Sequence, residues 1–166
     1  MRPQPESEEA AGAPRTPFDL GRVLGDTAAF VRSRREFGRI QFETKLPEEP
    51  LLVTGNPVMI GQVATNLLLN ACEAQPEGGS VAVVARREGE RVVAEVQDRG
   101  PGVKAADRER IFEPYARRDT HTARGSGIGL YAAKRLGESM GARLWCEPAH
   151  PHGARFVVAL PAAVSI

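Results

Sequence analysis

The 166-residue sequence predicts an α+β fold, a two-layer α/β sandwich in which three helices cover one face of a mixed, mostly antiparallel sheet. Three observations lead to this prediction. Apolar residues recur at helical spacing in three separate segments, and runs of alternating polarity lie between them and form hairpins. The composition, 42% hydrophobic and 26% charged, is typical of one globular domain with a substantial core.

The N-terminal segment 1–17 is rich in Pro, Glu and Ala, and we interpret it as a linker or the end of a preceding helical domain. The folded domain is predicted to extend over 18–166. Its first helix begins at Asp19, and Arg32 to Arg35 place positive charge at its C-terminal end, where the helix dipole favours it. The apolar face of this helix comprises Leu20, Val23, Leu24, Ala28 and Val31.

Later elements follow from local patterns of the same kind. Asn56 and Pro57 begin the second helix, because Asn accepts hydrogen bonds at the N-cap and Pro suits the first helical position. A short helix before Pro114 must end there. The expected elements are strands 40–43 and 51–53, helix 57–74, strands 80–87 and 91–98 joined as a hairpin, a short helix 105–111, helix 127–140, and strands 142–147 and 154–160.

Asp98 ends the strand 91–98 on an unusual face. Alternation places it on the same side as Val92, Ala94 and Val96, whereas Glu95 and Gln97 point the other way. A buried carboxylate needs hydrogen-bond donors. Two interpretations stay open at this point: a strand that frays into the turn Arg99-Gly100-Pro101-Gly102, or a ligand that donates a hydrogen bond to Asp98.

Helix 57–74 is apolar on most sides, which predicts burial, and its polar residues form one stripe. Gln62, Asn66, Asn70 and Glu73 follow at spacings of four, four and three. Two carboxamides at its centre indicate the wall of a site, because they need hydrogen-bond partners and their oxygens suit a hard cation such as Mg²⁺. The alternative is that both Asn side chains bind backbone groups of a neighbouring loop.

A glycine-rich segment, Gly125-Ser126-Gly127-Ile128-Gly129-Leu130, stands at the start of the third helix. Glycines there let backbone amides approach an anion at the helix N-terminus. The segment matches neither the P-loop nor the dinucleotide pattern. The stretch 99–124 before it has seven basic and four acidic residues, a net charge of +3, and we interpret it as a mobile lid over phosphates.

The remaining features exclude several classes. A net charge of +1 argues against a nucleic-acid or membrane-surface binder. The absence of a long apolar run or signal-like N-terminus predicts a cytoplasmic chain without membrane contact. Cys72 and Cys146 lack metal-ligand spacing and are expected to be reduced core residues.

These segments together resemble a known family. Residues 56–160 are similar to the catalytic, ATP-binding domain of bacterial sensor histidine kinases, within the GHKL group that also contains gyrase, mismatch-repair and chaperone ATPases. The resemblance rests on four motifs in order: the N box Asn66 to Ala71, the first glycine box Asp98 to Gly102, the F box Ile111 to Tyr115 and the second glycine box Gly125 to Leu130.

The resemblance implies a pocket for ATP and Mg²⁺. In it Asp98 accepts from the adenine amine, Asn70 holds Mg²⁺ and Asn66 lines the phosphate side. Arg118 and Arg124 are implied catalytic residues together with Asn66. The other implied nucleotide-binding residues are Glu73, Gly100, Gly102, Phe112, Tyr115, Arg117, Gly125, Ser126, Gly127, Ile128, Gly129 and Leu130.

The residue four positions before Asn70 separates subclasses of the family. ATPases and serine kinases of the group carry a Glu there as general base, whereas this chain has Asn66, which cannot accept a proton at neutral pH. None of His121, His150 and His152 has the context of a phosphoacceptor. We therefore expect transfer of the γ-phosphoryl group to a histidine on a separate dimerisation domain, with a response regulator downstream. The alternative is an ATP-sensing GHKL module without phosphoryl transfer.

Overall fold

The computed structural model describes residues 16–116 and 128–163. Its main layer is a five-stranded sheet of order β2-β4-β5-β7-β6, in which only the β2–β4 pair is parallel. The strands are β2 (Ile40–Lys45), β4 (Gly79–Glu88), β5 (Arg91–Asp98), β6 (Arg143–Pro148) and β7 (Ala154–Pro161). The predicted mixed, mostly antiparallel sheet is confirmed.

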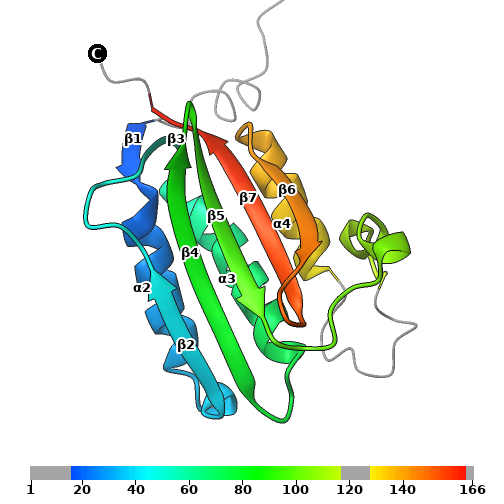
Figure 1. Cartoon of the computed structure of the whole chain (residues 1–166). Helices are drawn as coiled ribbons and strands as arrows, with labels where there is room; N and C mark the ends of the chain where they lie inside the picture. The colour runs from blue at the N-terminus through cyan, green and yellow to red at the C-terminus, as the bar shows by residue number, and fades with distance from the viewer. Residues whose placement is uncertain (1–15, 117–127, 164–166) are drawn as a thin grey trace, which may run out of the picture.

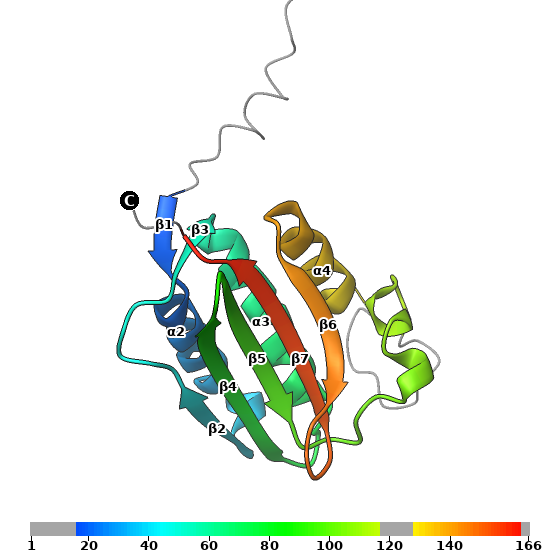
Figure 2. The same ribbon diagram turned by 45° about the horizontal axis from the view of Figure 1, so that its top comes forward.

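Three helices form the second layer. They are α2 (Leu20–Arg32), α3 (Pro57–Glu73) and α4 (Gly129–Ser139), and all three lie on the same face of the sheet (Figure 1). The view in Figure 2, turned by 45°, shows the same arrangement, with α3 between the other two. The predicted α+β two-layer sandwich is confirmed, and α3 is its central helix.

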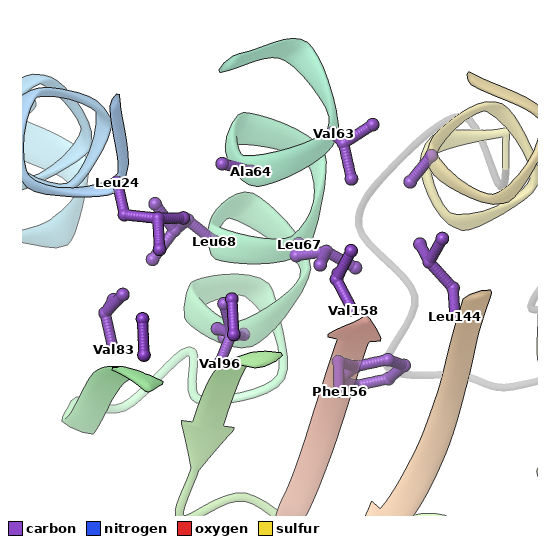
Figure 3. Close-up of a cluster of buried hydrophobic side chains, with 14 of the residues drawn as sticks. Leu24, Val63, Ala64, Leu67, Leu68, Val83, Val96, Leu144, Phe156 and Val158 are labelled. Atoms are coloured by element: carbon purple, nitrogen blue, oxygen red, sulfur yellow. The ribbon is translucent and has the colours of Figure 1, made fainter. Parts of the chain in front are cut away.

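The core lies between these layers. Side chains of α3 point into it together with those of β4, β5 and β7 (Figure 3). Leu67 and Leu68 are 2% and 0% exposed, and Val96 and Phe156 are 2% and 1% exposed. Burial on both flanks explains why α3 is apolar on most sides. It begins as predicted, because Oδ1 of Asn56 accepts from the N–H groups of Val58 (2.9 Å) and Met59 (3.3 Å).

A second, two-stranded sheet was not predicted. β1 (Thr16–Asp19) pairs antiparallel with β3 (Leu52–Gly55), so the strand expected at 51–53 does not join the main sheet. Two residues expected in the linker, Thr16 and Pro17, belong to β1. Oδ1 of Asp19 accepts from the N–H of Gly21 (3.0 Å), which caps α2, and from that of Leu51 (2.9 Å). This long-range contact places the two strands side by side.

The segment after β5 departs from the predicted helix 105–111. It forms two 3₁₀ turns, η2 (Ala105–Asp107) and η3 (Arg110–Phe112). A helix this short has little stability of its own, so tertiary packing decides the local conformation. Here Ile111 and Phe112, which are 9% and 5% exposed, turn into the core.

The face of the sheet opposite the helices also contains a buried charge. Glu95 lies on the face opposite that of Asp98, as the alternation indicated, yet it is only 5% exposed, because its carboxylate pairs with Arg86 (2.7 Å) and Arg155 (3.2 Å). Arg155 also pairs with Glu147, which accepts from the indole N–H of Trp145 (2.7 Å). These hydrogen bonds, that of Trp145 foremost, hold the pKa of Glu147 below its usual value.

Both cysteines are free and buried, as predicted. Burial raises the pKa of the Cys72 thiol to about 12, so it stays neutral at physiological pH. None of the helices in the described ranges is both long and apolar enough to cross a membrane.

Candidate functional site

Asp98 is the buried acid of the predicted site. It is the last residue of β5, pairs in register with Val81 of β4, and is 2% exposed. Its Oδ1 atom accepts from the backbone N–H groups of Gly100 (2.9 Å) and Ala154 (3.1 Å). The strand therefore does not fray before Asp98, and the carboxylate is oriented by main-chain donors from two different segments.

Glycines allow these two segments to approach each other. A Cβ atom on Gly153 would lie 1.9 Å from the carbonyl oxygen of Asp98, and one on Gly102 would lie 3.1 Å from the carbonyl oxygen of Gly153. Both glycines also have positive φ, +106° and +78°. The turn after β5 thus packs directly on the turn between β6 and β7. Arg99 adds to this contact, since its guanidinium donates to the carbonyls of His150 and His152.

The polar stripe of α3 reaches the start of α4. Nε2 of Gln62 donates to Oδ1 of Asn66 (2.9 Å), and Nδ2 of Asn66 donates to the carbonyl oxygen of Gly129 (3.1 Å). The predicted common face of the stripe is confirmed. For Asn66 the structure shows a bond to neighbouring backbone, which is the alternative that the sequence left open, and this bond fixes the N-terminus of α4 beside α3.

Asn70 behaves differently from Asn66. Its side chain is 8% exposed, and its buried Nδ2 atom has no hydrogen-bond partner among the described residues. A buried amide without a partner costs free energy, so such an atom is expected where a ligand completes the site. Glu73, also on the stripe, is the last residue of α3 and is half-buried.

The side chain of Asn70 is a candidate ligand for a magnesium ion. Within residues 16–116 and 128–163 there is no group of three His, Cys, Asp or Glu that could hold a metal alone. Mg²⁺ takes few protein ligands and shares its shell with phosphates and water. One carboxamide such as that of Asn70 matches that requirement, because rotation of the amide presents either its oxygen or its nitrogen to the ligand.

The second glycine box lies partly outside the described residues. Its residues Gly125, Ser126 and Gly127 fall there. The predicted site arginines that also fall there are Arg117, Arg118 and Arg124. Ile128 is the N-cap of α4, and its side chain forms no capping hydrogen bond; a helix N-terminus attracts anions through its N–H groups and dipole. The side chain of Leu130 is 6% exposed in the core, which leaves only its backbone to face a ligand.

The two aromatic residues of the F box differ in their surroundings. Phe112 packs edge-on against Phe156, with ring centroids 6.1 Å apart, and the Lys134 ammonium lies 5.2 Å from the centre of its ring. Its side chain therefore belongs to the core. Tyr115 is 45% exposed and has a positive φ of 62°.

Sequence reasoning missed three residues that support Asp98. Gly153, in the turn between β6 and β7, and Ala154, the first residue of β7, are 55 and 56 positions from Asp98, and no local pattern connects them with it. Gln75 directly follows the predicted helix 57–74 and was not a candidate site residue, yet it is 5% exposed and hydrogen-bonded to the turn after Asp98. A polar residue among Pro and Gly carries no signal of burial.

The family follows from a comparison with known proteins. Residues 55–164 match the family described as histidine kinase-, DNA gyrase B- and HSP90-like ATPase, and the chain belongs to it. The matched range contains all the predicted site residues.

Individual relatives place the chain near sensor kinases. It is 42% identical over 104 residues to the sensor protein PfeS of Pseudomonas aeruginosa, which covers 63% of this chain and 23% of PfeS. Among solved structures, the mycobacterial sensor histidine kinase MprB superposes with a TM-score of 0.77 at 27% identity, covering 91% of this chain and 99% of that one. Full-length ShkA in complex with AMPPNP gives a TM-score of 0.75 at 29% identity, covering 91% of this chain and 32% of that one. The chain thus spans less than a quarter of the length of PfeS.

Proposed function

We propose that this chain is the ATP-binding catalytic domain of a two-component sensor histidine kinase and that it transfers the γ-phosphoryl group of Mg-ATP to a histidine on a separate dimerisation domain. The observation that carries the proposal is the pairing of two sites along α3. One is the fixed carboxylate of Asp98, and the other is the N-terminus of α4 beside Asn66.

The length of α3 between these sites fits an ATP molecule. The turn after Asp98 abuts the C-terminal end of α3, because a Cβ on Gly100 would lie 2.9 Å from the carbonyl oxygen of Ala74. Asn66, eight residues earlier, contacts the start of α4. Eight helical residues span about 12 Å, which is comparable to the separation of the adenine ring and the terminal phosphate in an extended ATP.

Each end then has a defined task. Asp98 accepts from the amino group of adenine, and the N–H groups at the start of α4 bind phosphate oxygens. Asn70 lies between the ends and contacts the phosphates and Mg²⁺, and the ion, when bound, neutralises phosphate charge. Asn66 holds α4 in place through its bond to Gly129. Since a carboxamide is no base, catalysis rests on positioning and charge stabilisation, to which we assign Arg118 and Arg124.

The partners and location follow from this activity. The chain uses cytoplasmic ATP, donates to the histidine-bearing dimerisation domain of its kinase, and serves a response regulator downstream. AMPPNP, an ATP analogue, bound to the structural neighbour ShkA supports the nucleotide part of the proposal.

A radiolabelled ATP assay tests the proposal. The isolated chain is expected to bind Mg-ATP without hydrolysing it or labelling itself, and addition of the helical domain in trans is expected to give acid-labile, base-stable phosphohistidine on that domain. Arg118→Ala and Arg124→Ala should slow transfer more than they weaken binding. Binding without transfer to any supplied domain would favour the ATP-sensing module, rapid turnover by the chain alone would favour a hydrolase, and labelling of His121, His150 or His152 would place the acceptor in this chain.

A further inference from the structure

Gln75 uses all of its principal hydrogen-bonding capacity inside the protein. Its Nε2 donates to the carbonyl oxygens of Ala71 (3.1 Å) and Ser80 (3.0 Å), and its Oε1 accepts from the N–H groups of Ser80 (3.0 Å) and Arg99 (3.2 Å). The side chain is 5% exposed. One amide thus connects the last turn of α3, the start of β4 and the residue that follows Asp98.

Gly79 leaves space for the side-chain amide of Gln75. A Cβ on Gly79 would lie 2.0 Å from Oε1 of Gln75, so only glycine at that position admits the observed conformation. Gly100, which follows Arg99, packs on Ala74, the neighbour of Gln75: a Cβ on Gly100 would lie 2.9 Å from the carbonyl oxygen of Ala74. The first glycine box therefore packs against residues 74 and 75, and Gln75 makes the polar contact with it.

The bond to Arg99 acts on the peptide group next to Asp98. That N–H belongs to the same peptide plane as the carbonyl of Asp98, which itself lies against Gly153. The next N–H, of Gly100, donates to Oδ1 of Asp98, so a rotation of the Asp98–Arg99 peptide would also move this donor. Loss of the Gln75 acceptor would leave a buried N–H without a partner, and rotation of the peptide toward water would relieve that cost while misdirecting the carboxylate.

We propose that Gln75 is a positioning residue that sets the preference of the site for adenine over guanine, an inference that rests on the proposed ATP-binding function. Adenine presents an amino donor at the ring position where guanine presents a carbonyl acceptor. A carboxylate held in one orientation accepts from the first and repels the second. A carboxylate that is free to rotate loses the bond to adenine and no longer holds a fixed negative charge against the guanine carbonyl. The preference for adenine therefore falls.

The test compares ATP and GTP binding by calorimetric titration of the 166-residue chain. Gln75→Met keeps the shape of the side chain and removes its four hydrogen bonds. We expect the ATP dissociation constant to rise about tenfold with that of GTP little changed, so that the ATP-to-GTP preference falls about tenfold. A general loss of stability would not change this ratio.

Two further variants keep the result interpretable. Leu20→Ala removes a side chain that is 1% exposed at the start of α2, at the opposite end of the sheet from the C-terminal end of β5 (Figure 1). It is expected to lower stability and leave the nucleotide preference unchanged. If Gln75→Met does not fold, Gln75→Ser, which admits water in the vacated space but does not reach Arg99, is expected to show the same loss of preference.

The possible results distinguish the proposed ATP binding from the proposed role of Gln75. A parent chain that binds no ATP would refute the proposed function itself. A parent that binds ATP and GTP equally, or a folded Gln75 variant that keeps the preference of the parent, would refute the role of Gln75 and leave ATP binding intact.

Discussion

The backbone N–H of Ala154 donates to the Oδ1 atom of Asp98 at 3.1 Å, across 56 residues of sequence. The two residues stand at adjoining ends of β7 and β5, which pair antiparallel in the sheet. The carboxylate is thus oriented by the sheet before any ligand arrives. Such preorganisation reduces the entropy that a ligand must lose on binding.

Asp98→Asn is expected to weaken ATP and ADP binding about ten- to hundredfold, because a hydrogen bond to a charged group contributes roughly 1.5 to 3 kcal/mol. The fold should persist, since the amide oxygen of Asn still accepts from Gly100 and Ala154. Calorimetric titration measures the affinity. Asp107→Asn, which alters an exposed carboxylate 3.9 Å from Arg110, serves as control and should bind like the parent. Unchanged affinity in Asp98→Asn would contradict the adenine assignment.

Asn70→Ala is expected to remove most of the Mg²⁺ dependence of ATP binding while sparing adenosine. The variant deletes a buried amide whose Nδ2 atom lacks a partner among the described residues, so the protein itself loses little. Titrations with and without Mg²⁺ measure the effect. Asn56→Ala is the matched control on the same helix, because loss of its N-cap should lower stability by about 1 kcal/mol without changing Mg²⁺ dependence. Equal Mg²⁺ dependence in Asn70→Ala and the parent would favour a purely structural role.

Gly153→Ala is expected to destabilise the fold by about 2–5 kcal/mol, because steric overlap with the carbonyl of Asp98 adds to the strain of a positive φ. Gly89→Ala, in the hairpin loop with a φ of +61° and no neighbouring atom within 4 Å, should cost only about 1–2 kcal/mol. Denaturant unfolding compares the two. Equal costs would mean that the turns beside Asp98 adapt easily, contrary to their close packing.

The stability of the sheet should depend on pH through Glu147. Its pKa is lowered from the ordinary value of 4.5, so the carboxylate contributes stability above pH 4.5 and loses it as the pH falls through the lower pKa of the folded state. Thermal unfolding of the parent and Glu147→Gln should therefore converge on acidification. Trp145→Phe, which removes the first donor to Glu147, should weaken this pH dependence. A stability difference that is independent of pH would exclude this origin.

Much of the fold was predictable from local patterns. The alternation that ends at Asp98 and the four-residue spacing of Gln62, Asn66 and Asn70 correctly indicated an acid on the buried face and a single polar face of α3. Asn56 and Pro57 correctly marked the start of that helix. These predictions succeed because side-chain direction in a helix or strand depends on the position in the sequence alone.

Other features depended on contacts between distant residues. Local alternation gave only the face on which Glu95 lies, and its pairing with Arg86 and Arg155 explains its burial. The pairing of β1 with β3 in a second sheet likewise joins distant residues, and Oδ1 of Asp19 accepts from the N–H of Leu51, 32 residues away.

The sequence by itself therefore determined the type of most elements, the acid at the end of β5 and the polar face of α3, because each follows from the local periodicity of the chain. Only the tertiary structure decided which polar groups form hydrogen bonds with one another. Asn66 binds Gly129, Gln75 binds Arg99 and Asp98 binds Ala154, over separations of 63, 24 and 56 residues. Hydrogen bonds over such distances form only after the layers have packed, and for that reason no local pattern encodes them.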